Sequence, residues 1–343
     1  MTRPKGKKKP VKGIILSRTD SIGDVILSLP MAGVLKELYP ETKLIFLGKN
    51  YTREIIHTCK HIDEFLDWDE LREKDGAEQV REMQSTGAEA IIHVFPRKEI
   101  ALLAKKSGIP LRYGTTNRLY HWYSCNRLIR LSRRTSELHE AQLNLKLLRP
   151  LGAKEVFAID EIPAYYGFQK LNGAKHLEKY LREDRLNLIL HPKSKGSARE
   201  WGTDNFSKLI GLLPKEDFNV IITGTEEEGK LIRDSILNKF PHLQDTTGKL
   251  SLRELISLIN LADVLVAGST GPLHIAAALG KTCIGIYPPI RPMHPGRWAP
   301  IGENAHYLVE DKECDLCRKN LDCKCIRNIA PVRLIQKIME VTA

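Results

Sequence analysis

The sequence has no long hydrophobic run. None of its apolar stretches approaches the roughly 20 residues that a membrane-spanning helix requires, although hydrophobic residues make up 42% of the 343 positions. The apolar run behind the basic N-terminus is also too short for the core of a signal peptide. We therefore expect a cytoplasmic protein, and its length suggests two domains.

Acidic residues are fewer than basic ones. Asp and Glu number 42 against 53 Lys and Arg, which gives a formal net charge of +11. This excess favours an anionic partner, such as a nucleotide, a nucleic acid or an anionic membrane surface. A solvated surface with a basic tail would show the same excess, and residues 1–12 are expected to form such a disordered tail.

Cysteine is scarce except near the end of the chain. Three of the seven cysteines are scattered, and we expect them to be ordinary packing residues. The other four, Cys314, Cys317, Cys323 and Cys325, lie in the run CDLCRKNLDCKC. Its C-x-C half differs from the usual spacing of structural zinc sites, and a cytosolic location disfavours disulfides. We expect free thiols here, with a metal site as the alternative.

Short apolar runs alternate with helical patterns in both halves of the chain, which predicts βαβ units and parallel sheets. Strands are expected at 13–17, 43–47, 64–68, 90–95, 186–191, 219–223, 244–246, 264–267 and 282–287. Residues 13–157 are expected to form one domain, 158–170 a linker and 171–343 a second domain. The fold class is therefore α/β, with two doubly wound domains facing a cleft, and ligands are expected beyond the carboxyl ends of the strands.

Two segments of the second half suit a diphosphate. The stretch VLVAGSTGPLHIAAALG begins at Val264 and joins a strand to a helix whose first N–H groups can bind an anion; a plain strand–helix turn is the alternative. The loop HPKSKGSAREW begins at His191 and carries three cations that could contact phosphate oxygens. In TGTEEE, which follows the next strand, Glu226 could bind a ribose or simply favour a helix start.

The first half offers acids and cations at strand ends. In RTDSIGDVILSLP, Asp20 and Asp24 lie where a strand gives way to a helix, and from the residues alone either could act as a general base. Arg97 and Lys98 follow another strand. Residues 118–134 mix aromatic side chains with arginines. This mixture suits an anionic amphiphile at a membrane better than a nucleic acid, and a merely solvated face is the alternative.

These motifs, together with PMHPGRWAP, occur in one order over residues 13–340 and resemble glycosyltransferase family 9, the heptosyltransferases of lipopolysaccharide core synthesis. The resemblance implies a GT-B fold of two Rossmann-like domains and the inverting transfer of a heptose from ADP-heptose. It implies a lipid-linked sugar acceptor, reached from the cytoplasmic face of the inner membrane. No metal or other cofactor is expected, since cationic side chains and helix N–H groups can neutralise the diphosphate, and no nucleic-acid partner is expected.

The resemblance also implies roles for single residues. Asp24 would be the catalytic base, Arg199 would lie beside the diphosphate and Glu226 would meet the ribose. The donor diphosphate would be lined by Ser269, Thr270, Gly271 and His274. The acceptor or its loop would be held by Arg18, Ser21, Arg97 and Lys98. The family often carries an acid where Ser269 stands, so a different nucleotide-sugar donor, or a nucleotide-binding module without transfer activity, is the alternative.

Overall fold

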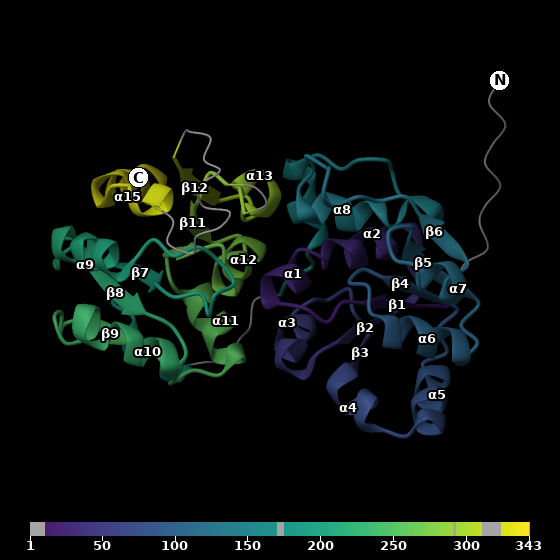
Figure 1. Cartoon of the computed structure of the whole chain (residues 1–343). Helices are drawn as coiled ribbons and strands as arrows, with labels where there is room; N and C mark the ends of the chain where they lie inside the picture. Colours follow the sequence, from purple (N-terminus) through teal and green to yellow (C-terminus); the bar gives the residue numbers. More distant parts are fainter. Residues whose placement is uncertain (1–10, 170–174, 291–292, 311–323, 343) are drawn as a thin grey trace.

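The computed structural model describes residues 11–169, 175–290, 293–310 and 324–342. Its chain forms two halves, and each is built on a parallel six-stranded sheet with helices on both faces (Figure 1). The predicted α/β class and the two doubly wound halves are therefore confirmed. The basic tail up to residue 10 and the cysteines Cys314, Cys317 and Cys323 lie outside the described residues.

The first sheet has the strand order β3-β2-β1-β4-β5-β6. Its strands are β1 (Gly13–Ser17), β2 (Lys43–Gly48), β3 (Glu64–Asp67), β4 (Ala90–His93), β5 (Leu111–Thr115) and β6 (Arg127–Ile129). Its helices are α1 (Ile22–Ile26), α2 (Pro30–Leu38), α3 (Arg53–His57), α4 (Trp68–Glu73), α5 (Gly76–Ser85), α6 (Lys98–Lys106), α7 (His121–Ser124) and α8 (Glu140–Lys146).

The second sheet has the strand order β12-β11-β10-β7-β8-β9. Its strands are β7 (Leu186–His191), β8 (Phe218–Ile222), β9 (Gln244–Asp245), β10 (Val264–Gly268), β11 (Thr282–Tyr287) and β12 (Ala305–Val309). Its helices are α9 (Thr203–Leu212), α10 (Glu226–Ile232), α11 (Leu252–Leu261), α12 (Gly271–Ala278), α13 (Pro295–Trp298), α14 (Lys324–Arg327) and α15 (Pro331–Thr342).

The central strands are apolar on both faces because each face is covered by helices. In β1, Ile14 and Leu16 pack into the core beneath α1, α2 and α8, whereas Ile15 packs on the other side against residues of α4, α5 and α6. All three side chains are fully buried. This two-sided burial is why the strand reads as a continuous apolar run rather than an alternating one.

Three strands were not expected from the sequence. β5 and β6 hold Arg112 and Arg127, and β12 is only half-buried. Edge or near-edge strands bury less surface, so their sequences carry a weaker apolar signal. The helical pattern over 25–38 also divides in two, because Pro30 lacks a backbone N–H and therefore takes the first turn of α2.

The predicted linker follows the first half closely. A 3₁₀ segment, Ile159–Tyr165, packs on α2, where a Cβ on Gly33 would come within 2.3 Å of the Tyr165 carbonyl oxygen. Phe168 then forms a bridge with Cys59. Within the residues described, no helix is both long and apolar enough to cross a membrane.

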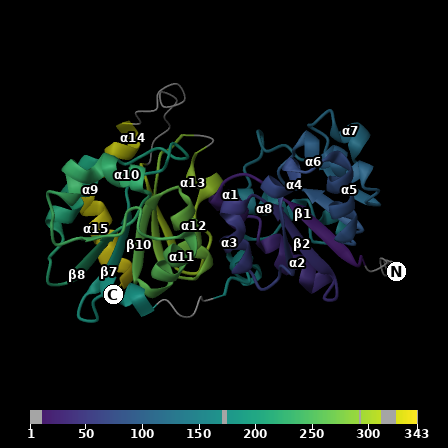
Figure 2. The same ribbon diagram turned by 90° about the horizontal axis from the view of Figure 1, so that it is seen from below.

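The two halves meet along α1, α3, α11 and α12, which lie at the boundary in both ribbon views (Figure 2). A second contact joins α8 to α13. There the Nε2 of His139 lies 3.0 Å from the carbonyl oxygen of Ala299, and Arg297 pairs with Glu140 at 2.6 Å. Because β1 and β10 both end at this boundary, the loops after them face one another.

Candidate active site

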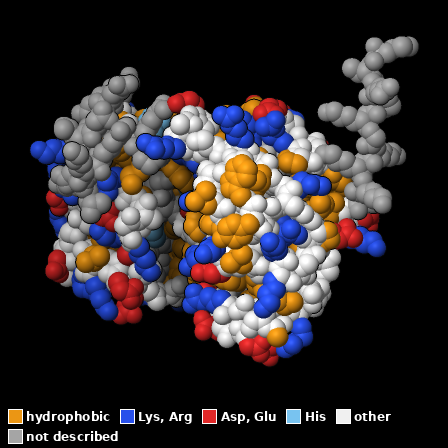
Figure 3. Space-filling view, turned by 45° about the vertical axis from the view of Figure 1, so that its right-hand side comes forward, with side chains coloured by type: hydrophobic (Ala, Val, Ile, Leu, Met, Phe, Trp, Pro, Cys, Tyr) orange, Lys and Arg blue, Asp and Glu red, His pale blue; other side chains and the backbone are white. Residues whose placement is uncertain are grey.

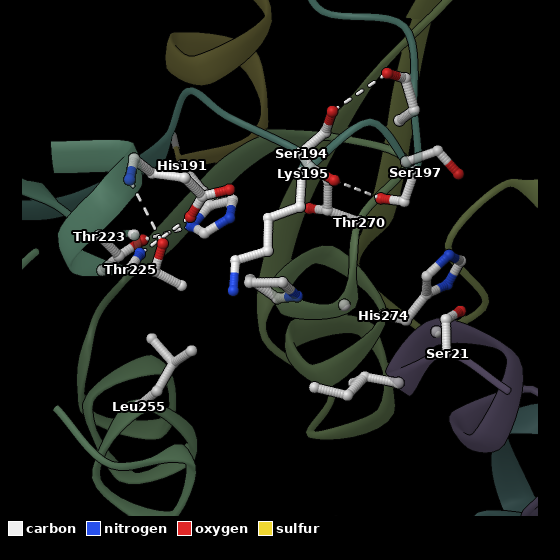
Figure 4. Close-up of a pocket in the computed structure, with 18 of the residues that line it drawn as sticks. Ser21, His191, Ser194, Lys195, Ser197, Thr223, Thr225, Leu255, Thr270 and His274 are labelled. Carbon is white, nitrogen blue, oxygen red and sulfur yellow. Dashed lines mark hydrogen bonds between the residues drawn. The ribbon is translucent and has the colours of Figure 1, made fainter. Parts of the chain in front are cut away.

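A cavity of about 790 Å³ lies between the two halves (Figure 4). Its walls come from the start of α1 in the first half and, in the second half, from the loops and helix starts that follow β7, β8, β9, β10 and β11. These are carboxyl ends of parallel strands, where open α/β sheets bind ligands. The prediction that strand-end residues of both halves face one cleft is therefore confirmed by the geometry.

Two acids and one arginine lie at the first-half side of the cavity, and Asp24 is the one of the three that lines it. Arg18 follows β1 and is almost fully buried. Its guanidinium donates to both carboxylate oxygens of Asp20, at 2.9 and 3.0 Å, and to Oδ1 of Asp24 at 2.5 Å. The hydroxyl of Ser21 donates to the other oxygen of Asp24 at 2.5 Å. Asp24 lines the cavity, while Asp20 is engaged by Arg18 in a bidentate pair.

The buried Glu140 side chain forms an ion pair with Arg18 on the side away from the cavity. The Glu140 side chain is 2% exposed and receives Arg18 at 3.4 Å, Arg133 at 2.9 Å and Arg297 at 2.6 Å. Asn144, one turn along α8, accepts from Arg18 at 3.0 Å. A buried carboxylate thus joins a residue of the second half, Arg297, to the arginine that holds Asp24.

The charges of this cluster are fixed by their neighbours. Burial alone would lower the pKa of Arg18, but the carboxylates of Asp20, Asp24 and Glu140 outweigh burial and raise it. Burial would raise the pKa of Glu140, and its arginine partners reverse that and lower it. Burial raises the pKa of Asp20 to about 6, since the opposing effect of Arg18 is partly cancelled by Asp24.

The starts of α1 and α12 pack directly against each other at the wall of the cavity. A Cβ on Gly23 would come within 2.8 Å of Cδ2 of His274, and a Cβ on Gly271 within 2.9 Å of Cγ2 of Ile22. Each glycine therefore makes room for a side chain of the opposite helix. Figure 4 shows Ser21, at the start of α1, beside His274 of α12.

Neither of these helix starts is capped by its own side chain. Ser21 and Thr270 are the N-cap residues of α1 and α12, and neither side chain accepts a helix N–H. By contrast, Thr225 and Ser251 cap α10 and α11 with full capping boxes. An uncapped helix start leaves N–H groups and the positive end of the helix dipole for a ligand. At the start of α12, Ser269, Thr270 and Gly271 all line the cavity.

His274 is a neutral group in this wall. It is buried, and burial lowers its pKa to about 4 while nearby Asp24 acts in the opposite direction. Its Nδ1 has no hydrogen-bond partner among the described residues. A buried polar atom without a partner costs free energy unless a ligand or water satisfies it, and this atom lies in a residue that lines the cavity.

The loop after β7 closes the second-half wall. Glu200 accepts from the Ser194 backbone N–H at 3.1 Å and pairs with Lys193 at 2.5 Å. Lys195 adopts φ 48°, in the left-handed region that favours glycine. Lys195 and Arg199 both line the cavity, and Figure 4 shows the Lys195 side chain extending toward its interior.

The far end of the cavity is apolar on one side and polar on the other. Leu250, Leu252 and Leu255 form the apolar side, and Glu226 lines the cavity from the first turn of α10. Glu226 is exposed and pairs with Lys230 at 2.8 Å. An apolar floor beside a carboxylate is suited to a flat base attached to a ribose.

A sequence profile described as glycosyltransferase family 9 (heptosyltransferase) matches residues 80–325. The chain belongs to this family. The resemblance predicted from the five motifs is confirmed, and with it the GT-B fold.

The relatives of this glycosyltransferase align with it over most of their own length and over most of the chain. A Haemophilus influenzae protein, whose name assigns it only provisionally to the glycosyltransferases, is 29% identical over 84% of the chain and 86% of its own length. The lipopolysaccharide core heptosyltransferase OpsX of the same species is 21% identical over 80% and 79%. The structure of Escherichia coli ADP-heptose LPS heptosyltransferase II matches 96% of the chain and 98% of its own, with a TM-score of 0.75 and 16% identity.

Most residues predicted for the site of this glycosyltransferase line one cavity. They are Ser21, Asp24, Arg199, Glu226, Ser269, Thr270, Gly271 and His274. Arg18 lies beneath Asp20 and Asp24 rather than on the cavity wall. Arg97 donates to Oγ1 of Thr19 at 2.5 Å, and Lys98 begins α6; neither lines the cavity.

Sequence reasoning missed Glu140 and Tyr51. Glu140 lies 122 residues from Arg18 and is one of many glutamates at a helix start, so no local signal marks it. Tyr51 lines the cavity and donates its hydroxyl to the carbonyl oxygen of Asp20. Among the described residues, no group of three or more His, Cys, Asp or Glu side chains is arranged to hold a metal ion.

Proposed function

We propose that this glycosyltransferase moves a heptose, with inversion, from ADP-heptose onto a lipid-linked sugar acceptor of the lipopolysaccharide-core type. The observation that carries the proposal is the position of Asp24, which lines the same cavity as the uncapped start of α12. A proton acceptor and an anion-binding helix start in one cavity are what a single displacement at an anomeric carbon requires. The heptosyltransferase names of the relatives support the sugar and the acceptor class.

In the proposed reaction, Asp24 takes the proton of the acceptor hydroxyl. The hydroxyl oxygen forms the new bond to the anomeric carbon while the bond to the diphosphate oxygen breaks, and ADP leaves with the electron pair. A positioned general base typically contributes about 10²–10⁴ in rate. Arg18 and Ser21 orient the Asp24 carboxylate, and Asp20 keeps Arg18 in place through its bidentate pair.

The leaving diphosphate would be stabilised from the second half. The start of α12, with Ser269 and Thr270, and the cations Lys195 and Arg199 all line this cavity. Preorganised donors and cations of this kind act where negative charge develops. The positive charge that the leaving group needs can therefore come from side chains and helix N–H groups, and no metal is part of the proposal.

The nucleotide would lie toward the far end of the cavity. Leu250, Leu252 and Leu255 can cover the face of the adenine, and Glu226 can accept hydrogen bonds from the ribose hydroxyls. Glu226 would have to exchange its pair with Lys230, which is solvent-exposed and therefore weak. On the acceptor side, Arg97 and Lys98 remain proposed contacts for the anionic groups of the acceptor.

A thermal-shift screen of the purified protein against nucleoside diphosphates and their sugars tests the proposal. We expect stabilisation by ADP and ADP-heptose and little by the UDP and GDP series, because a ligand that binds only the native state raises the melting temperature. A preference for another nucleotide would change the donor but keep the glycosyltransferase. ADP binding without transfer to any lipopolysaccharide-core acceptor would favour a nucleotide-binding module instead.

A further inference from the structure

The segment from residue 100 to residue 136 carries charge of only one sign. It contains Lys105, Lys106, Arg112, Arg118, Arg127, Arg130, Arg133 and Arg134, and no Asp or Glu, although the chain has 42 acids in all. Arg112 and Arg133 are occupied inside the fold, by backbone carbonyls and by Glu140 respectively. The other six are exposed. This segment of the first half therefore adds six exposed cations and no acid to the surface, although Lys106 lies near Asp75 of the preceding helix.

Three large apolar side chains project from the same segment, at and before α7. Leu119 is 86% exposed, Trp122 61% and Tyr123 51%; we call these three residues the α7 patch. The indole N–H of Trp122 donates to the carbonyl oxygen of Thr116 at 3.0 Å, so its polar edge is satisfied and its ring faces solvent. Exposed Trp and Tyr next to an aliphatic side chain are typical of residues that lie at a membrane–water interface.

Cations border the α7 patch directly. Lys105 donates to the backbone carbonyl oxygen of Tyr123 at 2.8 Å, which holds its ammonium against α7, and Arg118 is exposed one residue before Leu119. Glu99, at the start of α6, is an acid near this turn and acts on Tyr120. Figure 3 turns this side of the molecule forward and shows hydrophobic side chains gathered on it with Lys and Arg side chains around them. Lys and Arg side chains near an anionic bilayer strengthen its attraction for a protein surface.

The α7 patch lies on the same sheet edge as the candidate active site. α7 follows β5, and Asp24 follows β1; both strands run parallel in one sheet, so both residues lie beyond its carboxyl edge. Arg97, which follows β4 between them, donates to Thr19 on one side and acts electrostatically on Tyr120 on the other. The patch and Asp24 therefore lie on the same side of the first half.

We propose that the α7 patch and its cations dock this protein on an anionic lipid bilayer, with the acceptor side of the cavity turned toward the membrane surface. The inference rests on the proposed function, because a lipid-linked acceptor must be met where its lipid is anchored. The apolar side chains enter the headgroup region while Lys105 and Arg118 contact lipid phosphates. A nucleic acid would also be attracted by the cations but would leave Leu119 without a partner.

Co-sedimentation of the full-length protein with phosphatidylcholine vesicles, with and without phosphatidylglycerol, tests the proposal. We expect binding that needs phosphatidylglycerol and weakens at high salt. Trp122→Ser and Leu119→Ser should each reduce partitioning roughly tenfold, the loss expected for one large apolar side chain. The Leu119 side chain is 86% exposed and contributes little to the core, so its variant should fold even if loss of the Trp122 hydrogen bond disturbs α7.

Matched controls come from the rest of the surface. Leu231→Ser removes an apolar side chain that is 69% exposed in the second half, and Arg81→Ser removes a cation that is 67% exposed on α5. Neither should change partitioning. Equal partitioning of the α7 variants and the wild type would overturn the proposal. So would wild-type binding to an oligonucleotide in preference to the anionic vesicles.

A transfer assay separates this inference from the proposed function. With a delipidated, water-soluble acceptor, the α7 variants should retain wild-type turnover, and with the acceptor in vesicles they should lose about as much rate as they lose partitioning. Wild-type turnover without any vesicle binding would overturn the docking inference and keep the function. Vesicle binding by the α7 patch without turnover of either acceptor would count against the function alone.

Discussion

The two helix starts that face each other in the cavity differ in charge. α1 carries Asp24 in its first turn and rests on a buried cluster of Arg18, Asp20 and Glu140. The first turn of α12 holds no acidic or basic residue, and its His274 is kept neutral by burial. The same element, a helix start after a parallel strand, is therefore built once around fixed charges and once around N–H groups and hydroxyls.

This difference divides the chemistry between the halves. A carboxylate placed beside an uncapped helix start would bind it, as the capping glutamates of α10 and α11 do. Arg18 and Ser21 instead hold Asp24, which leaves the start of α12 available to an anionic leaving group. Proton removal and stabilisation of the diphosphate can then occur on opposite sides of one sugar.

Replacing Asp24 should have the largest effect. Asp24→Asn removes the proposed proton acceptor but keeps the size of the side chain, so we expect the transfer rate to fall about 10²–10⁴-fold. Donor binding should stay close to wild type, because the donor contacts come from the second half. Steady-state transfer and calorimetric ADP binding measure the two quantities.

Asp20→Asn is the matched control for the base. Asp20 pairs with Arg18 and does not line the cavity, so its loss should reduce the rate much less than the loss of Asp24. If Asp20→Asn proved the more severe variant, the assignment of the base would have to be exchanged between the two acids.

Breaking the buried carboxylate cluster should come next. Glu140→Gln leaves Arg18, Arg133 and Arg297 without their shared partner in a buried site, which typically costs about 3–5 kcal/mol. Denaturant unfolding measures this loss. Because Arg18 orients Asp24 and Arg297 belongs to the other half, we also expect kcat to fall while ADP affinity changes little.

Glu155 provides the comparison for Glu140. It pairs with Lys146 and Arg149 near the same helix but is 58% exposed. Glu155→Gln should change the free energy of unfolding by no more than about 0.5 kcal/mol. Similar losses of unfolding free energy in Glu140→Gln and Glu155→Gln would mean that the buried cluster stabilises the protein no more than an exposed ion pair does.

Acid should destabilise the protein through buried neutral histidines. Burial lowers the pKa of His93 and His139 to about 3 and that of His274 to about 4. Between these values and the ordinary pKa near 6.5, the unfolded chain binds more protons than the native one, so stability falls as the pH falls. Asp20, with its pKa raised to about 6, opposes this trend as a single group.

Urea unfolding at a series of pH values measures the acid effect. Each such histidine contributes on the order of 1 kcal/mol per pH unit below about 6.5. His93→Asn should flatten the pH dependence of stability, because it removes a buried imidazole with a lowered pKa. His93 stacks on His121 and has no hydrogen-bond partner among the described residues. An equally steep curve in that variant would show that His93 is not one of the groups responsible.

The fold could be read from the sequence where strands are buried on both faces. β1, β7 and β11 were predicted with their observed bounds because their apolar runs are continuous. The weak strands β5, β6 and β12 could not be predicted, since edge position depends on which strands pair in space. The site followed the same rule, because motifs at strand ends are local, whereas the Arg18–Glu140 pair joins residues 122 positions apart.

For some residues, the sequence could not predict whether the side chain lines the cavity. Arg18, Arg97 and Lys98 stand after strands, as Asp24 and Arg199 do, and their positions in the sequence look equivalent. Only the structure shows that Arg18 turns under the acids and that Arg97 turns toward Thr19. Strand-end position predicts the edge of the sheet, and side-chain pairing decides which residues reach the ligand.

The smallest change we consider is a single methyl group between the two helix starts. Gly23→Ala places a Cβ within 2.8 Å of the buried His274 ring, so α1 and α12 must move apart at a cost of about 1–3 kcal/mol. Gly211→Ala adds the same methyl group to α9, where the nearest atom is 3.8 Å away, and should be neutral or slightly stabilising. If the cavity works by holding Asp24 opposite the start of α12, Gly23→Ala should lower kcat while ADP still binds. Equal turnover in the two glycine variants would show that the close approach of these helices serves packing alone.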